Sequence, residues 1–259
     1  MRVFIITQDE PVYTPVYLTN VIQKCDHSVV GMTALSPSGQ IGWVILAKQR
    51  LAMYGPVDFI KAVSIYGFSW LMGRWPVGRL RNRFYSVRQL SAHYSIPLYH
   101  CSNINAEDYI GKLRALDLDV VLSVAANQRF GRELLAVPRV ACLNVHSALL
   151  PQYRGLDGLF WALAHGETQV GVTVHIMNED FDDGAIVGQQ ALAVSPNDTL
   201  HSLYFKAIDV GSTLLAHVLD QLDSGTVDAR PNDVSKGSYF SWPDREAAQR
   251  FRANGRRFF

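Results

Sequence analysis

The chain has 259 residues, of which 48% are hydrophobic and 18% are charged. This length suits one large α/β domain, or one domain with a small appendage, and the composition excludes a disordered chain. Because 24 basic residues are balanced by 23 acidic ones and the net charge is only +1, we expect no nucleic-acid partner.

Apolar periodicity and capping residues predict alternating strands and helices. In the first half, we expect strands at residues 2–7, 28–33, 96–101 and 119–126, and helices at 14–24, 86–94 and 105–116. In the second half, we expect strands at residues 140–146, 170–177 and 185–194, and helices at 132–137, 159–165 and 198–222. The opening order of strand, helix and strand is typical of a parallel α/β unit with a right-handed crossover.

Two stretches depart from this alternation. Residues 41–83 hold many aliphatic residues and two helix-like halves on either side of Gly55-Pro56. We expect a helical insertion there that packs on the sheet or on a partner chain, and the second arrangement would give a homodimer. After residue 222 we expect an irregular tail with a short helix near residues 244–251. We therefore divide the chain into a domain of residues 1–222 and a C-terminal extension of residues 223–259.

A basic cluster follows the insertion. Its members are Arg74, Arg79, Arg81, Arg83 and Arg88. Clustered charges of this kind are commonly a solvated surface, but they would also suit a phosphate or a partner contact. Both interpretations stay open on the sequence alone.

The cysteine content and the first residues favour a cytoplasmic protein. Three cysteines without a CxxC spacing predict free thiols in a reducing compartment, and no His, Cys or Asp cluster has metal-ligand spacing. The apolar residues 3–6 end before Asp9 and are too few for a signal peptide. Charged residues interrupt the apolar stretch 41–73, so we expect no membrane span.

The most informative segment, residues 143–155, includes the end of a predicted strand. Asn144 and His146 are two residues apart, so on an extended strand their side chains leave the same face. An amide and an imidazole side by side can donate two convergent hydrogen bonds to an oxygen that gains negative charge during attack on a carbonyl. Taken alone, however, His146 could equally be a structural histidine, and Asn144 could fix a turn.

A second segment, residues 171–187, runs from one predicted strand through an acidic loop into the next. The loop holds Asp182 and Asp183 ahead of Gly184. Repulsion between neighbouring carboxylates is expected to make one of them hold its proton more tightly. A carboxylate beside His146 would orient the ring, favour the imidazolium and accept the proton of an attacking amine. By itself, the loop could be a solvated turn.

Taken together, the two segments resemble the folate-dependent formyltransferases. The family pattern is an Asn-x-His strand leading into Ser-x-Leu-Leu-Pro-x-Tyr-x-Gly, then Gly-x-Thr-x-His and an Asp-x-Gly loop, and this sequence has each part in order. The resemblance spans residues 1–222 and is weakest over 35–85. It implies a Rossmann-like, mostly parallel sheet flanked by helices, with a short C-terminal extension.

The resemblance also implies roles for individual residues. Asn144 and His146 carry over as the oxyanion-stabilising pair, and Asp182 as the matching aspartate. The co-substrate would be 10-formyltetrahydrofolate, with no metal, bound between two loops whose candidate residues are Val124, Gln128, Arg129, Phe130, Asn178 and Asp180. The candidate substrate-binding residues are Ser147, Tyr153, Arg154 and Gly155. Val124 and Phe130, which could flank the pterin, could equally be ordinary core, and His175 has a supporting role at best.

The implied activity is transfer of a formyl group to a primary amine. Few residues follow the long helix compared with methionyl-tRNA formyltransferases, and glycinamide ribonucleotide formyltransferases lack an insertion like residues 41–83. The acidic loop looks most similar to that of sugar N-formyltransferases, so a nucleotide-linked amino sugar is the expected acceptor. The alternatives that stay open are the two enzymes just named, a formyltetrahydrofolate hydrolase, and a non-catalytic folate- or nucleotide-binding module.

Overall fold

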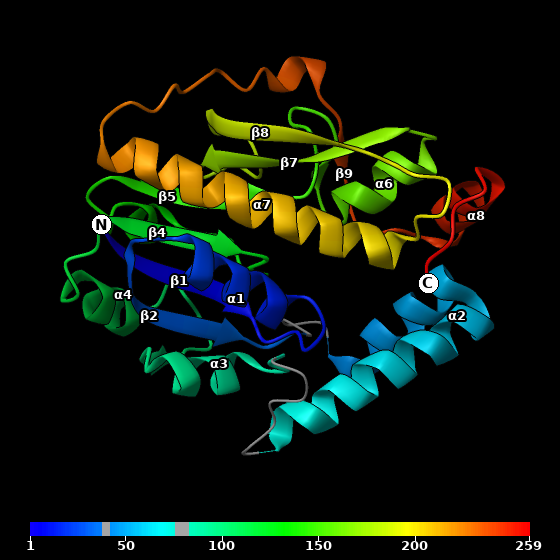
Figure 1. Cartoon of the computed structure of the whole chain (residues 1–259), viewed down its shortest axis with the longest axis horizontal. Coiled ribbons are helices and arrows are strands. Elements are labelled where there is room, and N and C mark those ends of the chain that lie inside the picture. The colour runs from blue at the N-terminus through cyan, green and yellow to red at the C-terminus, as the bar shows by residue number, and fades with distance from the viewer. Residues whose placement is uncertain (38–41, 76–82) are drawn as a thin grey trace.

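The centre of the molecule is a seven-stranded sheet with the order β3-β2-β1-β4-β5-β7-β8 (Figure 1). The computed structural model describes residues 1–37, 42–75 and 83–259. The strands are β1 (Arg2–Gln8), β2 (Ser28–Leu35), β3 (Leu98–Tyr99), β4 (Val120–Val124), β5 (Ala141–His146), β7 (Gln169–Ile176) and β8 (Ile186–Ala193). The first five strands in this order pair in parallel, whereas β7 is antiparallel to both of its neighbours. The expected Rossmann-like, mostly parallel sheet is therefore confirmed.

Helices cover both faces of the sheet because the central strands are apolar on both sides. In β1, Val3 and Ile5 pack in one core with α1 (Thr14–Lys24), α3 (Val87–Tyr94) and α7 (Leu200–Asp223). Phe4 and Ile6 point to the opposite face, where α4 (Glu107–Arg114) and α5 (Arg132–Leu135) cover them. Alternate residues of one strand thus serve two cores, as in other sheets buried between helical layers.

A third apolar core ties the residues after α7 to the rest of the molecule. In this core α6 (Gly158–Ala164) packs against α8 (Arg245–Ala253), with Phe160 and Phe251 stacked at 5.2 Å between ring centroids. Asp244 caps α8, which confirms the short helix predicted near residues 244–251. The tail also contains η1 (Val234–Lys236) and β9 (Tyr239–Phe240), and β9 pairs with β6 (Arg154–Gly155). The domain division at residue 222 stays a prediction.

The helix predicted to begin at Asn105 begins later, at Glu107, with Ala106 as its N-cap. The Asn105 side chain is engaged elsewhere: its amide donates to the carbonyl of Arg129 at 2.9 Å and accepts from the Gly131 N–H at 2.7 Å. The predicted start at residue 105 is therefore two residues too early, because a contact with a distant loop takes up the Asn105 side chain instead. That contact fastens the loop after β4, which is one of the two predicted folate-binding loops.

The insertion forms α2 (Trp43–Arg74), which is broken at Gly55, where φ is +67°. The expected pair of helical halves on either side of Gly55-Pro56 is confirmed, since proline cannot continue a helix and glycine tolerates positive φ. Figure 1 shows the second half leaving the region of α8 and running beside the sheet. Across the described residues, we found no helix long and apolar enough to cross a membrane.

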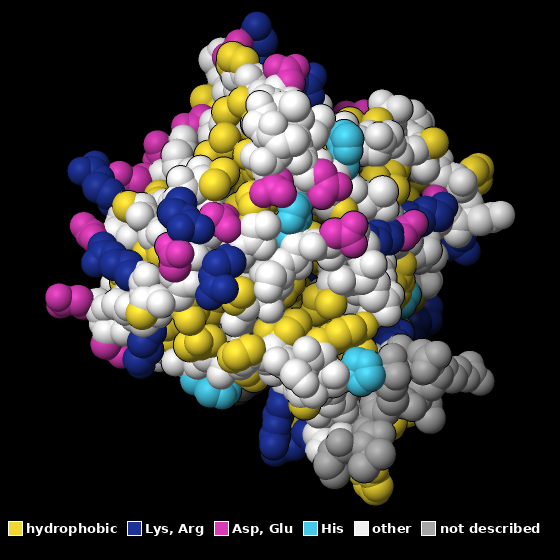
Figure 2. Space-filling view, turned by 60° about the vertical axis from the view of Figure 1, so that its left-hand side comes forward, with side chains coloured by type: hydrophobic (Ala, Val, Ile, Leu, Met, Phe, Trp, Pro, Cys, Tyr) yellow, Lys and Arg dark blue, Asp and Glu magenta, His cyan; other side chains and the backbone are white. Residues whose placement is uncertain are grey.

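The described members of the basic cluster lie in different settings. Arg74 stacks on Trp70, and Arg83 donates to the carbonyl of Val12 at 2.7 Å, just before α1. Arg79 and Arg81 lie outside the described residues. The suggested phosphate contact stays a prediction. On the side that Figure 2 brings forward, Lys and Arg are interspersed with Asp and Glu, and no continuous area carries one sign.

Candidate active site

The two predicted donors sit at the carboxyl end of β5, beside the antiparallel strand β7. Asn144 is paired in register with His175, and His146 with Thr173. The Asn144 side-chain nitrogen Nδ2 lies 3.1 Å from Nε2 of His175. His175 therefore joins the site directly, which goes beyond the supporting role expected from the sequence. The alternation in Gly-x-Thr-x-His signals this placement, because Thr173 and His175 share one face of β7.

Asp182 joins these side chains from the loop between β7 and β8. Its Oδ1 lies 3.3 Å from Nδ2 of Asn144 and 3.4 Å from Nε2 of His175. Its Oδ2 accepts a hydrogen bond from the Gly155 N–H at 2.8 Å and lies 3.6 Å from Nδ1 of His146. Its side chain is only 11% exposed. Segments far apart in the sequence thus converge on one buried carboxylate.

The backbone around Asp182 is shaped for this convergence. Asp182 has a φ of +50°, a region that Asp tolerates better than most residues. Gly184 is required in the same turn, because a Cβ there would collide with the carbonyl of Ile176. The Asn232 amide donates to the carbonyl of Asp182 at 2.9 Å and holds the loop from the side of the tail. Neither Gly155 nor Asn232 was expected to contact this aspartate.

The pKa of the Asp182 carboxyl is lowered to about 2. Burial is the largest single influence and raises the pKa, but the charge of His146, the hydrogen bonds from His175 and Gly155, and the charge of His175 together outweigh it. The expectation that carboxylate repulsion would raise a pKa in this pair is therefore wrong for Asp182, because donors surround it. The carboxylate stays ionised throughout the neutral range.

Both ring nitrogens of His146 face oxygen acceptors. Nε2 lies 2.8 Å from the carbonyl oxygen of Tyr153, and Nδ1 faces the Asp182 carboxylate. A carbonyl oxygen can only accept, so Nε2 carries a proton in this contact, and an imidazolium could donate to both partners. Tyr153 itself has a φ of +57°, which turns its carbonyl toward the ring. The two contacts hold the ring in one orientation beside Asp182.

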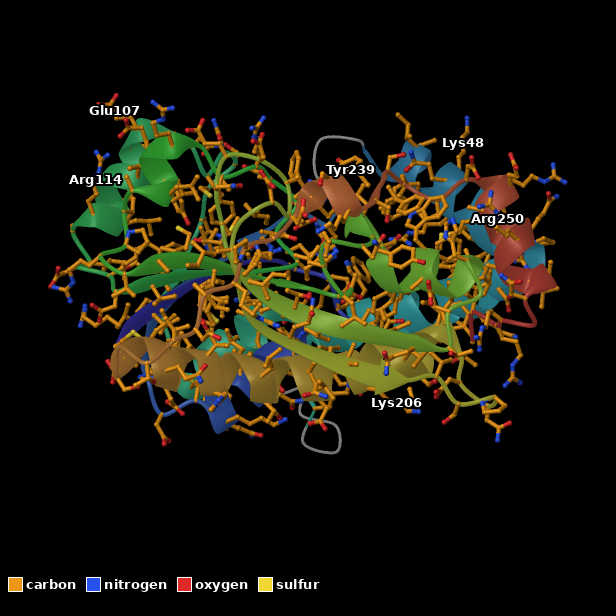
Figure 3. The ribbon with its side chains drawn as sticks, turned by 90° about the horizontal axis from the view of Figure 1, so that it is seen from above. Lys48, Glu107, Arg114, Lys206, Tyr239 and Arg250 are labelled. Atoms are coloured by element: carbon orange, nitrogen blue, oxygen red, sulfur yellow. The ribbon has the colours of Figure 1, made fainter. Side chains whose placement is uncertain are left out.

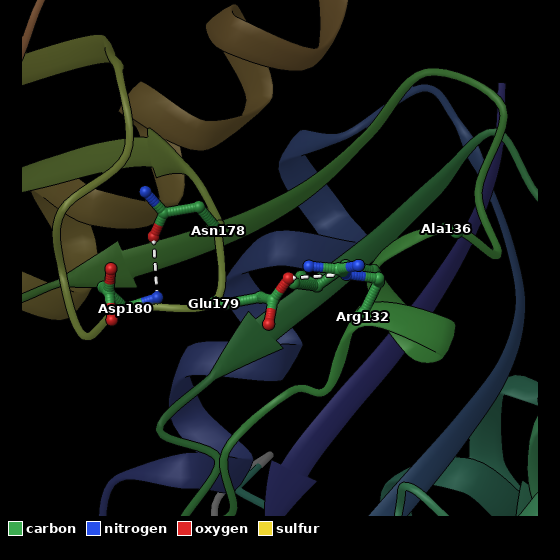
Figure 4. Close-up of a pocket in the computed structure, with 6 residues that line it drawn as sticks. Arg132, Ala136, Asn178, Glu179 and Asp180 are labelled. Carbon is green, nitrogen blue, oxygen red and sulfur yellow. Dashed lines mark hydrogen bonds and ion pairs between the residues drawn. The ribbon is translucent and has the colours of Figure 1, made fainter.

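The structure brings the two predicted folate-binding loops together. Arg129 Nε donates to the carbonyl of Glu179 at 2.7 Å, and Arg132 Nε lies 2.8 Å from the Glu179 carboxylate. Arg129 also lies 3.6 Å from Asp180. A shallow pocket of about 480 Å³ lies where the two loops meet, and it is lined by Arg132, Leu135, Ala136, Asn178, Glu179 and Asp180 (Figure 4). This pocket is open to solvent, and Asn144, His146 and Asp182 are not among the residues that line it.

The remaining predicted folate-binding residues are placed less directly. Val124 and Phe130 are buried in two different apolar cores. Their surroundings are therefore those of ordinary core residues, which was the alternative to a contact with the pterin. Gln128 accepts from the Ile104 N–H at 3.0 Å and donates to the carbonyl of Ser102 at 2.9 Å. Asn178 accepts from the Asp180 N–H at 3.1 Å, which shapes the acidic loop. A folate-binding role for these residues stays a prediction.

Two of the predicted substrate-binding residues, Tyr153 and Gly155, contact the cluster around Asp182 through their backbones. Tyr153 meets His146 through its carbonyl, while its hydroxyl donates to Glu167 at 2.9 Å. Gly155 contacts Asp182 through its N–H. Arg154 stacks over the ring of Tyr239, and Ser147 is half-buried. The predicted substrate-binding role of all four residues is a proposal rather than a finding.

A second polar cluster is formed by Asp157, Tyr204, Arg50 and Trp242, and Asp157 lies two residues after Gly155 in the sequence. Asp157 accepts a hydrogen bond from the Tyr204 hydroxyl at 3.0 Å. Arg50 lies 4.2 Å from the ring centroid of Trp242; burial lowers the pKa of its guanidinium, but neighbouring groups including Tyr54 and Asp157 raise it overall. Within the described part of the chain, Asp157 Oδ2 and Trp242 Nε1 are buried without a hydrogen-bond partner. Sequence reasoning missed this cluster, because its members are scattered along the chain.

Comparisons with known proteins place the fold in context. A sugar N-formyltransferase from a Shewanella species superimposes with a TM-score of 0.57 at 19% identity, covering 93% of this chain and 76% of the other. The N-formyltransferase of Helicobacter canadensis, solved with folinic acid and dTDP-3-aminofucose, gives a TM-score of 0.57 at 15% identity, covering 92% and 70%. At these identities the likeness shows the fold alone.

The sequence comparisons go further. The methionyl-tRNA formyltransferase of Trichlorobacter lovleyi is 31% identical over 153 residues, which are 59% of this chain and 48% of that protein. The chain spans about half the length of the curated relatives it matches. The family model described as formyl transferase matches residues 76–219, more than half of the sequence. The chain therefore belongs to the formyl transferase family.

Proposed function

We propose that the protein transfers a formyl group from 10-formyltetrahydrofolate to a primary amine. The observation that carries this proposal is the convergence of Asn144, His146 and His175 on the buried Asp182. Attack of an amine on a formyl carbon places negative charge on the formyl oxygen. An amide and an imidazolium held next to each other can stabilise that charge without costly reorganisation.

Asp182 acts through its charge rather than as a base. A carboxyl with a pKa of about 2 is a weak proton acceptor at neutral pH. Its ionised form faces Nδ1 of His146 and fixes the orientation of the ring. The attacking amine then loses its proton to solvent, and the nitrogen of the departing tetrahydrofolate takes one up from solvent, so the transfer balances without a proton on Asp182.

Asn144 supplies the second donor. An amide has two hydrogens, and Nδ2 of Asn144 donates one of them to Oδ1 of Asp182; Nδ2 also lies 3.1 Å from Nε2 of His175, which donates to the same carboxylate. A formyl oxygen would compete for one of them, so the donor is already oriented before the reaction begins. Loss of one such donor costs on the order of 10²–10³ in turnover.

The loops around Arg129 and Glu179 fit a folate. A reduced folate supplies an activated formyl group and carries an anionic glutamyl tail. Arg132 borders the pocket of Figure 4, and Arg129 lies on the same loop; both have exposed guanidinium groups, which suit carboxylates. Asn178 and Asp180 offer polar groups on the opposite side of the same pocket.

For the acceptor, we propose a nucleotide-linked amino sugar. Asp157 Oδ2 and Trp242 Nε1 are buried without a hydrogen-bond partner, and Asp157 lies two residues after Gly155, which contacts Asp182. Buried polar atoms of this kind are suited to hydroxyl-rich ligands. The Helicobacter canadensis neighbour was solved with a nucleotide-linked amino sugar, which supports the same class. Methionyl-tRNA is the competing acceptor, because the curated relatives carry that name.

One assay separates the proposed function from its rivals. The protein is mixed with 10-formyltetrahydrofolate and, in separate arms, nucleotide-linked amino sugars, methionyl-tRNA, glycinamide ribonucleotide or no amine. Release of tetrahydrofolate only with an amino sugar supports the proposal. Release without amine indicates a hydrolase, and release with another amine identifies that acceptor. Folate binding, measured by calorimetry, without release in any arm indicates a binding module.

A further inference from the structure

The outward surface of α2 is unusually apolar. Ten of the fourteen large apolar side chains exposed in the described part of the chain belong to α2 or its C-cap. They are Val44, Ile45, Leu51, Val57, Ile60, Val63, Phe68, Trp70, Leu71 and Trp75. Soluble surfaces rarely gather so many such residues unless they contact something. We call these ten residues the α2 apolar surface.

The second half of α2 shows which side contacts the protein body. Ala62 and Ser69 are buried, and a Cβ at Gly73 would meet the carbonyl of Tyr85 at 2.7 Å. Small residues at this spacing let the helix lie close against the body. On a helical wheel with 100° per residue, the exposed apolar residues of this half lie on one side of the helix. The two outermost, Trp70 and Phe68, are about 160° apart. A single helix–helix contact uses a stripe of roughly 100°, so one partner helix would leave apolar side chains uncovered.

The exposed charges on the described residues of α2 itself are positive. Lys48, Lys61 and Arg74 are exposed on α2, whereas its one acidic residue, Asp58, is only 21% exposed. In Figure 3, Lys48 on α2 and Arg250 on the neighbouring α8 lie at the same end of the molecule. Two copies facing each other through α2 would bring like charges together, whereas an anionic surface would neutralise them.

The aromatic residues at the end of α2 fit a water–lipid boundary. Arg74 lies 4.4 Å from the ring centroid of Trp70, and Trp75 follows as the C-cap. Tryptophan and arginine side chains commonly sit together at the headgroup level, with the ring in the apolar zone and the charge in water. Between the two halves of α2, an open recess is lined by Val44, Ala47, Lys48, Leu51 and Phe59, which suits an acyl chain beneath a headgroup.

We propose that α2 docks the protein on an anionic lipid surface. The helix lies in the interface and does not cross it, since none in the described segments is long and apolar enough to do so. The α2 apolar surface enters the headgroup zone, and Lys48, Lys61 and Arg74 contact lipid phosphates. The residues proposed to dock are separate from those of the proposed formyl transfer, because Arg50, through which α2 joins the second polar cluster, is not part of the α2 apolar surface.

Flotation with lipid vesicles tests the proposal on the full chain. Wild-type protein is expected to float with vesicles of phosphatidylcholine plus phosphatidylglycerol, and much less with phosphatidylcholine alone. Leu71→Ser, at a position 59% exposed, is expected to weaken vesicle binding about tenfold. The matched control is Val140→Ser, an exposed apolar position away from α2, which is expected to change nothing.

A second pair of variants tests the charges. Lys61→Gln removes an exposed lysine of α2 that pairs with Asp58, and Lys112→Gln removes one of α4 that pairs with Asp108. We expect about a fivefold loss of vesicle affinity for the first and none for the second. The proposal is overturned if wild-type protein floats with neither vesicle, or if the members of either pair behave alike.

Two further measurements test the lipid docking of α2 without relying on a substitution that destabilises the fold. Phospholipids brominated in their acyl chains should quench the tryptophan emission of wild-type protein, and Trp70→Phe should reduce the quenching while retaining vesicle binding. Unchanged quenching would count against insertion of α2. Sedimentation should give the same molecular mass for wild-type and Leu71→Ser protein. A wild-type dimer that Leu71→Ser dissociates would assign the surface to a second copy of the chain and overturn the lipid proposal.

Discussion

Replacing Asp182 with asparagine removes the charge at the centre of the cluster and keeps the shape of the side chain. The pKa of Asp182 is lowered from its ordinary 3.8 to about 2, which corresponds to about 2 kcal/mol of folding free energy. This free energy is present above pH 4, because there the folded and unfolded carboxyls are both ionised. It is lost as the pH falls from about 4 to 2, where only the unfolded state takes up the proton.

We therefore expect Asp182→Asn to lower the free energy of unfolding by about 2 kcal/mol at neutral pH. The difference from wild type should shrink as the pH falls from about 4 to 2. Urea titrations at several pH values measure this directly. In parallel, formyl transfer should fall on the order of 10²-fold or more, because His146 loses the carboxylate that orients its ring.

Asp183→Asn is the matched control, since the same charge is removed one residue away. Its carboxyl makes no contact with His146 or Asn144 in the described structure. Wild-type stability and turnover are expected for this variant. If Asp182→Asn were as stable and as active as Asp183→Asn, the electrostatic account of the site would be refuted.

Three further substitutions probe the neighbours of Asp182. Asn144→Ala should reduce kcat on the order of 10²–10³-fold with an unchanged melting temperature; full activity would remove it from the oxyanion site. His175→Leu should lower kcat about tenfold and leave KM for the folate unchanged, since it removes a partner that positions both Asn144 and Asp182; a rise in KM alone would contradict this. Gly155→Ala should destabilise the fold by about 2 kcal/mol or more, because φ is +91° and a Cβ would collide with the Phe240 carbonyl; an unchanged urea midpoint would refute the assigned strain.

The sequence predicted the sheet and its helices well because their apolar residues repeat with regular periods. In β1, alternate residues feed two cores, and α7 has its predicted start at Thr199, whose side chain caps the helix together with Ser202. Where long-range contacts decide the structure, local patterns were misleading. Asn105 has the chemistry of an N-cap but is taken up by a loop after β4.

The sequence predicted those parts of the candidate site that lie on one strand or within one motif. The spacing of Asn144 and His146 shows that they share a face, but no local pattern reveals that Gly155 and Asn232 also hold Asp182. The pKa of Asp182 depends on these distant donors, so its direction could not be obtained from the adjacent Asp183. Arg50 joins the polar cluster beyond Gly155 from α2, far away in the sequence.

The central claim is that the cluster around Asp182 moves a one-carbon unit onto an amine. Its most direct test is mass spectrometry after a single turnover with 10-formyltetrahydrofolate labelled with ¹³C in the formyl group and a nucleotide-linked amino sugar. We predict that wild-type and Asp183→Asn proteins place the label on the sugar nitrogen, and that Asn144→Ala and Asp182→Asn do not within the same time. Equal labelling by all four proteins, or labelled formate in place of labelled sugar, would contradict the account.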